Sequence, residues 1–107
     1  MLILLDECVP EPLRGYISGH EVRTIRAAGW SGKKNGELLN LMTAAGVHVF
    51  LTVDQNLGYQ QNLTNLSIAI IVMKAITNRL NDLLPLVPAV ENALDTIQEG
   101  QLVVISE

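Results

Sequence analysis

Two aspartates follow apolar runs that are typical of buried strands. The run LILL, residues 2–5, ends at Asp6, and the run VHVFLTV, residues 47–53, ends at Asp54. An apolar run followed by an acid and turn residues predicts a parallel strand with a carboxylate at its C-terminal end. Ligands bind at that edge of an open α/β sheet, and neighbouring strands lie about 4.8 Å apart. If the two strands are neighbours, Asp6 and Asp54 can reach one small, hard cation.

A third carboxylate is expected at the same edge. Glu37 falls in the first turn of a predicted helix, and a helix that follows a parallel strand begins on the carboxyl side of the sheet. Three clustered carboxylates repel one another unless a cation joins them. Mg²⁺ and Mn²⁺ suit such oxygen ligands and also bind phosphate oxygens. Asp6, Glu37 and Asp54 are therefore predicted to hold Mg²⁺ or Mn²⁺ and to activate a water against a phosphodiester, with Glu7 and Asn56 close by.

Each acid also has an ordinary structural explanation. An aspartate at a strand end often starts a turn. Glu37 could merely stabilise the helix dipole, by about 0.3–1 kcal/mol. The matching positions of Asp6 and Asp54, at the ends of two strands, favour a functional site over either explanation alone.

Strands and helices are predicted to alternate along the chain. Apolar runs indicate most of the strands, an alternating pattern indicates the one over residues 20–26, and glycines end several elements. A turn or short helix is expected over residues 56–63. The predicted strands are residues 2–5, 20–26, 47–53, 67–73 and 102–105, and the predicted helices are residues 10–18, 37–45 and 78–98.

This alternation predicts a single domain over residues 1–107. We expect a three-layer α/β/α sandwich with a mostly parallel sheet of about five strands. The expected strand order is 2-1-3-4, which places the first and third strands side by side. The last strand is expected at the edge, in either direction. Pro85 and Pro88 should break or kink the start of the last helix.

The motifs resemble those of short PIN-like proteins. LLDECVP is similar to their LLDE-N-x-P opening, NGELLNLM to their D-x-E-I-L helix start, and LTVDQNLGY to their T-x-D-x-D-F-G segment. The helix LPLVPAVENAL and the closing GQLVVISE also fit, so the resemblance covers nearly the whole chain. PIN domains are α/β/α nucleases that use clustered carboxylates and Mg²⁺ or Mn²⁺, mostly on RNA, and many are toxins held by an antitoxin. The resemblance implies a metal-dependent endoribonuclease of single-stranded RNA whose metal-binding acids are Asp6, Glu37 and Asp54. The resemblance also implies an antitoxin protein as a partner. The hydrophobic content of 49% separately leads us to expect a further partner or a self-association surface, such as a homodimer.

Three features depart from that pattern. Asn56 stands where PIN-like proteins usually have a second aspartate, so it can bind a metal through its carbonyl but removes a negative charge. Asn35 likewise replaces an acid, and many relatives continue past the position of Glu107 into an arginine-bearing strand. These departures predict a weakened nuclease, and the alternative is a catalytically silent PIN-like interaction domain.

A phosphoacceptor receiver domain is the main rival of another class. Receivers also carry an acidic pair after the first strand, here Asp6 and Glu7, and an acceptor aspartate after the third, here Asp54. Mg²⁺ is again the cofactor. Lys74 and Thr77 follow the fourth strand, however, and no lysine follows the last one, where the phosphate partner of a receiver would lie.

A glycine-bearing loop offers a nucleic-acid contact. Trp30, Lys33 and Lys34 lie in GWSGKKNG, where they could stack a base and hold phosphates. They could equally anchor the loop and carry solvated charges. The formal net charge of −4 argues against a broad basic surface for nucleic acid, although a local one is compatible with it.

The composition favours a cytoplasmic protein that does not enter a membrane. Cys8 is the one cysteine, which fits a reducing compartment. No apolar run approaches the roughly 18 residues of a membrane span. His20 and His48 are predicted at strand starts, about 15 Å from the two aspartates for a five-residue strand, and so in structural roles.

Overall fold

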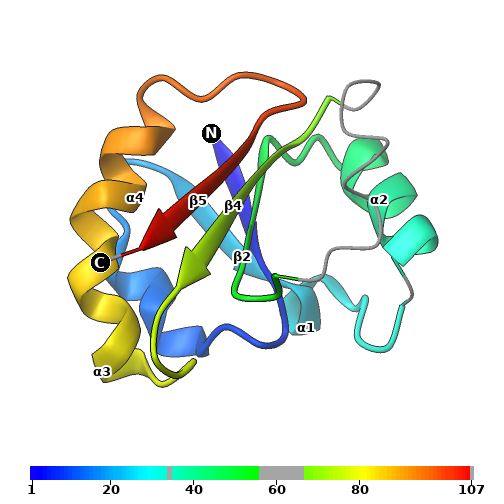
Figure 1. Cartoon of the computed structure of the whole chain (residues 1–107). Coiled ribbons are helices and arrows are strands. Elements are labelled where there is room, and N and C mark those ends of the chain that lie inside the picture. The colour runs from blue at the N-terminus through cyan, green and yellow to red at the C-terminus, as the bar shows by residue number, and fades with distance from the viewer. Residues whose placement is uncertain (34, 56–66, 107) are drawn as a thin grey trace.

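Five parallel strands form one sheet in the order β2-β1-β3-β4-β5. The computed structural model describes residues 1–33, 35–55 and 67–106. The sheet twists across the molecule, with β5 at one edge (Figure 1). The strands are β1 (Leu2–Leu5), β2 (Glu21–Thr24), β3 (Val49–Thr52), β4 (Ala69–Lys74) and β5 (Leu102–Ser106).

The predicted strand order is confirmed, and β1 and β3 are neighbours. Leu5 of β1 pairs with Leu51 of β3, and the N–H of Asp6 donates to the Leu51 carbonyl over 2.9 Å. The two strands therefore end at the same level of the sheet. The last strand, whose direction was left open, is parallel to β4.

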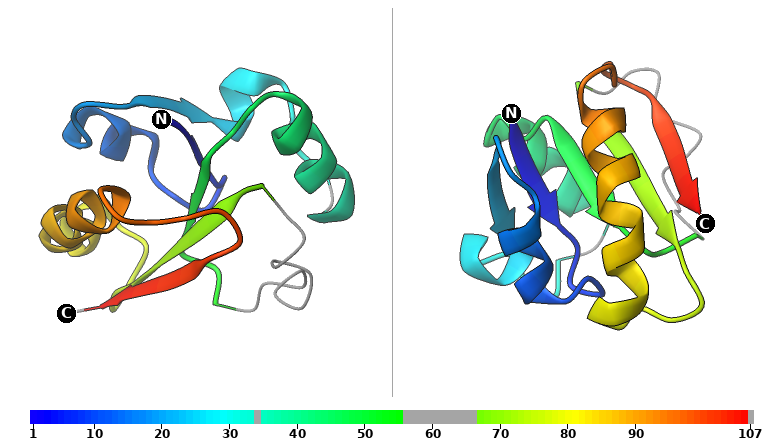
Figure 2. Two further views of the ribbon diagram at one scale, coloured as in Figure 1. Left: turned by 90° about the horizontal axis from the view of Figure 1, so that it is seen from above. Right: turned by 90° about the vertical axis from the view of Figure 1, so that its left-hand side faces the viewer.

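Helices lie on both faces of the sheet, an arrangement compatible with the expected three-layer α/β/α fold (Figure 2). One face is covered by η1 and the C-terminal helices, and the other by α1 and α2. The bounds of these 3-10 and α-helices are η1 (Glu11–Tyr16), α1 (Ile25–Ala28), α2 (Asn35–Ala44), α3 (Leu80–Leu83), η3 (Leu84–Leu86) and α4 (Val87–Leu94).

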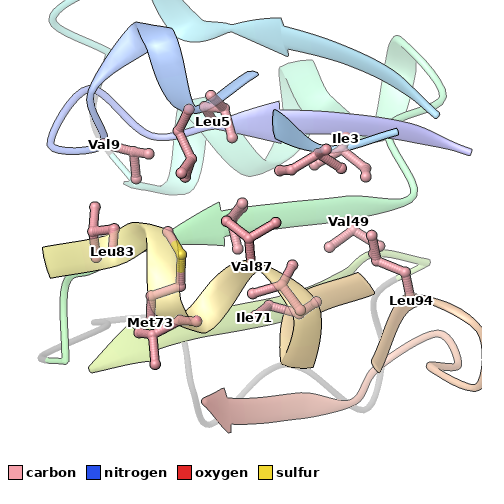
Figure 3. Packing of buried hydrophobic residues seen from close by; sticks show 14 of the residues in the cluster. Ile3, Leu5, Val9, Val49, Ile71, Met73, Leu83, Val87 and Leu94 are labelled. Atoms are coloured by element: carbon pink, nitrogen blue, oxygen red, sulfur yellow. The ribbon is translucent and has the colours of Figure 1, made fainter. Parts of the chain in front are cut away.

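The sheet has a hydrophobic core on each face because successive strand side chains point to opposite sides. In β1, Ile3 and Leu5 pack on the α4 face, whereas Leu4 packs on the α2 face. Figure 3 shows Val87 and Leu94 directed at the strand residues of the first core. Strands buried on both faces are typical of parallel sheets.

The predicted second strand, residues 20–26, is shorter than expected. The hydroxyl of Thr24 accepts the N–H of Ala27 over 3.0 Å and so caps a helical turn, which ends at Gly29 with φ 81°. This cap is the physical reason for the difference, because it satisfies a helix N–H that a strand would leave to a neighbour. The chain therefore turns away from β2 at Thr24.

The prolines of the last helix act as predicted. Pro85 lies within η3, and Pro88 lies in the first turn of α4, so the predicted helix over residues 78–98 is divided into three short pieces. The turn or short helix expected over residues 56–63 falls outside the described residues. Within the described part of the chain, no helix has the length and apolar character needed to cross a bilayer.

Candidate functional site

The carboxylate of Asp6 is held by hydrogen bonds at the end of β1. Its Oδ1 accepts the N–H of Glu7 over 2.8 Å, and its Oδ2 accepts the hydroxyl of Thr52 over 2.7 Å. The thiol of Cys8 lies 3.5 Å from the same Oδ2 and donates to it. These hydrogen bonds fix the orientation of the carboxylate. Asp6 is only partly buried, so part of the residue still faces solvent.

Thr52 connects the two predicted site aspartates. Its side chain is fully buried, its hydroxyl donates to Asp6, and the same oxygen accepts the N–H of Asp54 over 3.0 Å. One hydroxyl thus ties the end of β1 to the start of the loop after β3. The sequence analysis did not single out Thr52, although a hydroxyl inside the apolar run VFLTV was the signal that could have found it.

Asp6 and Asp54 flank the switch point of the sheet. The chain order reverses between β1 and β3, since β2 lies on one side of β1 and β4 on the far side of β3. In doubly wound sheets, ligands bind outside the carboxyl ends of the strands at this point. The two aspartates follow the two strands that border it, and Asp54 is exposed.

A pocket of about 350 Å³ lies beside Asp6, between the carboxyl ends of β1 and β2. Asp6, Glu7 and Glu11 line its acidic part, and Arg26 lies in its wall. The Glu7 carboxylate is held there by the N–H of Gly32, at 3.2 Å. Glu11 was not foreseen as a site residue, because its place in the pocket depends on how η1 packs after β1.

The thiol of Cys8 remains protonated near neutral pH. Partial burial raises its pKa above 9.0, and the neighbouring Asp6 carboxylate raises it further, while hydrogen bonds from the Val53 backbone and Thr52 oppose the shift. A protonated thiol can donate a hydrogen bond, which agrees with its position beside Asp6 Oδ2. Cys8 therefore supports the carboxylate in this state and is not an activated nucleophile.

The structure brings Asp6 and Asp54 to neighbouring strand ends, but Glu37, the third predicted acid, is paired with a lysine. Glu37 lies at the start of α2 on the exposed surface, and its carboxylate forms an ion pair with Lys33 at 3.6 Å. Among the described residues, no three His, Cys, Asp or Glu side chains form a group that could hold a metal ion. A metal-binding role for Glu37 stays a prediction.

The other predicted contact residues differ in their surroundings. Trp30 is partly buried against the core on the α2 face, which supports its role as a loop anchor, whereas Lys33 is exposed. Lys34 and Asn56 lie outside the described residues, so their predicted roles in phosphate and metal binding are not addressed by the structure.

The two histidines lie at the amino ends of the strands, opposite the carboxyl ends where Asp6 and Asp54 lie, as predicted. The N–H of Leu2 donates to His48 Nδ1 over 2.9 Å, and the terminal amine of Met1 lies 3.3 Å from His20 Nδ1. Both rings therefore stand by the start of β1, away from Asp6 at its end.

No family model, curated protein or solved structure matches this chain.

Proposed function

We propose that this chain is a PIN-like, Mg²⁺- or Mn²⁺-dependent endoribonuclease with a weakened active site. The observation that carries the proposal is the link Asp6–Thr52–Asp54 at the switch point, where one buried hydroxyl bonds to the Asp6 carboxylate and to the Asp54 backbone. The PIN-like motifs of the sequence supply the class of reaction.

The described oxygen atoms suit a hard cation. Mg²⁺ is commonly held by one or two carboxylates, keeps several waters and binds substrate phosphates, so Asp6 and Asp54 form a sufficient protein set. Asn56 would add a neutral carbonyl oxygen. Glu37 would join this set only by leaving its ion pair with Lys33. When bound, such an ion supplies Lewis acidity and a water of lowered pKa.

The surrounding residues have separable roles in this proposal. Thr52 orients Asp6 through its 2.7 Å hydrogen bond, and Cys8 donates to the same oxygen. Arg26 lies in the pocket wall beside Asp6, and Lys33 is exposed at the same edge of the sheet. Both can hold phosphates of a single strand, so binding should weaken as salt rises.

Cleavage of a single-stranded RNA oligonucleotide tests this function. With Mn²⁺, the wild-type chain should cleave slowly, Asp6→Asn should lower the rate at least about tenfold, and Asn56→Asp should raise it, since it restores a negative charge. Glu21→Gln, a change in β2 away from this edge, is the matched control and should leave the rate unchanged. Equal background rates in all four proteins would reject the nuclease and favour the silent interaction domain.

The strand order favours a receiver domain as the second candidate. Receivers share the order 2-1-3-4-5, and Asp54 follows the third strand as their acceptor does. Two features count against a receiver. Lys74 ends β4, whereas the phosphate-binding lysine of a receiver would follow β5, and the hydroxyl of Thr77 already donates to Asp82. Stoichiometric phosphorylation of Asp54 by acetyl phosphate in the presence of Mg²⁺ would select the receiver over the nuclease.

A further inference from the structure

The two edges of the sheet differ in how they are protected against pairing with another strand. Charged side chains, prolines, bulges and short length are the usual protections. The edge strand β2 carries Glu21 and Arg23, which form an exposed 2.6 Å ion pair. The other edge strand, β5, reads LVVIS, without charge or proline, and its register with β4 contains no bulge. Of the two edge strands, β2 is therefore protected against pairing with a further strand, and β5 is not.

The hydrogen-bond register determines which peptide groups of β5 point outward. The N–H of Ile70 in β4 donates to the carbonyl of Gln101 over 2.8 Å, just before β5. Because bonding residues alternate along a parallel ladder, the peptide groups of Val103 and Ile105 face β4. Those of Leu102, Val104 and Ser106 face away from it. Among the described strands, none lies beyond them, as the edge position of β5 in Figure 2 shows.

We infer that β5 is a homodimer interface, in which it pairs antiparallel with β5 of a second copy about a two-fold axis at Val104. A two-fold contact uses the same surface on both copies. The outward peptide groups are placed symmetrically about Val104, so each Val104 exchanges both hydrogen bonds with its counterpart. Leu102 then lies opposite Ser106, and the sheet continues from one copy into the other.

The side chains favour a second copy as the occupant. Val104 is 54% exposed and would pack against its counterpart, while Val103 would face Ile105 on the other side of the sheet. Such β-branched pairs each stabilise an antiparallel ladder by about 0.2–1 kcal/mol. The charges agree as well, because Glu99 precedes β5 and Lys74 lies beside its last residue. Antiparallel pairing brings the Lys74 end of one copy toward the Glu99 end of the other.

The oligomeric state in solution tests this interface. Light scattering coupled to gel filtration, over a range of protein concentrations, should show a dimer of the wild-type chain. Val104→Lys places two like charges opposite one another at the axis, so it should give a monomer. Thr96→Lys adds the same charge at an exposed site after α4 and should leave the dimer intact. The two variants have equal net charge, so a difference between them reports the interface.

A proline variant separates loss of pairing from loss of folding. The N–H of Val104 points outward, so Val104→Pro removes both hydrogen bonds that the two Val104 residues would exchange in the dimer and none of the ladder with β4. It should be a monomer with an unchanged circular dichroism spectrum. A monomeric wild-type chain would overturn the proposal and leave the edge to a strand of another protein. A dimer that survives both Val104 variants would overturn it equally, because the contact would then lie on another face.

Discussion

The buried hydroxyl of Thr52 donates a 2.7 Å hydrogen bond to the carboxylate of Asp6, across the boundary between β3 and β1. These residues lie 46 positions apart in the sequence, and the pairing of the two strands brings them together. The same hydroxyl accepts the N–H of Asp54. A single oxygen atom thus contributes both to the orientation of Asp6 and to the backbone position of Asp54.

Replacement of that oxygen should cost measurable stability. Thr52→Val keeps the shape of the side chain but removes the hydroxyl that donates to Asp6 Oδ2 and accepts the N–H of Asp54, at a cost of about 1–3 kcal/mol in the free energy of unfolding. Urea denaturation measures this loss. Thr96→Val, at an exposed position, is the control and should change stability by less than about 0.5 kcal/mol. Equal effects of the two variants would show that the Thr52 hydroxyl stabilises nothing.

The titration of Cys8 should report its environment. Burial, and after it Asp6, raise the thiol pKa above 9.0, and alkylation by iodoacetamide requires the thiolate. The midpoint of the alkylation rate against pH should therefore lie above pH 9. Because the folded pKa is raised, the contribution of Cys8 to stability is present below pH 9 and is lost as the pH rises further. Since Cys8 is the one cysteine, the labelled site is unambiguous.

The same titration in Asp6→Asn tests the contact between the two side chains. Loss of the carboxylate should lower the midpoint, because the charge of Asp6 and its hydrogen bond with the thiol both raise the thiol pKa. A midpoint unaffected by Asp6→Asn would contradict the placement of the thiol beside that carboxylate.

Two isoleucines provide a matched test of the core. Ile71 in β4 is fully buried, whereas Ile76 in the loop that follows is 93% exposed. Ile71→Ala should destabilise the fold by about 2–5 kcal/mol, because it removes buried methyl groups and leaves a cavity. Ile76→Ala should have an effect within about 0.5 kcal/mol. Denaturant unfolding of both variants checks the difference, and a large effect of Ile76→Ala would place that side chain in contacts that the structure lacks.

The parts of the fold that were predictable depend on patterns within short stretches of sequence. Apolar runs, and an alternating pattern over residues 20–26, identified the strands. Their alternation with helical segments implied the parallel order. The aspartates Asp6 and Asp54 were predicted because each ends such a run, which is a local signal. The division of the C-terminal helix followed from Pro85 and Pro88 in the same way.

The remaining features depend on contacts between distant segments or on competition between local arrangements. Thr52 is a site residue because β3 lies beside β1, and Glu11 lines the pocket because η1 folds back over the end of β1. The capping of α1 by Thr24 competes with continuation of β2, and propensity alone does not rank the two. The position of Glu37 in the first turn of a helix was predicted correctly. That position does not determine whether its carboxylate turns toward Asp6 and Asp54 or pairs with Lys33, as it does in the structure.

A divalent metal should raise the melting temperature if Asp6 and Asp54 share an ion, because ligand binding stabilises the folded state. Mn²⁺ at about 100 times its dissociation constant would add about 2.7 kcal/mol. Asp54→Asn should remove most of that gain. Glu37→Gln should keep most of it, since Glu37 is paired with Lys33. Differential scanning fluorimetry measures the shifts, and a gain in Asp54→Asn equal to that of the wild type would count against the site.

The position of a bound Mn²⁺ ion tests the central claim most directly. Crystals soaked in Mn²⁺ should give an anomalous difference peak at the carboxyl ends of β1 and β3, within about 2.3 Å of an oxygen from each of Asp6 and Asp54. Asp6→Asn crystals under the same conditions should lose the peak. A peak elsewhere, or carboxylates of Asp6 and Asp54 more than about 10 Å apart, would contradict a shared metal site, because metal–oxygen bonds of about 2.1 Å cannot span that separation.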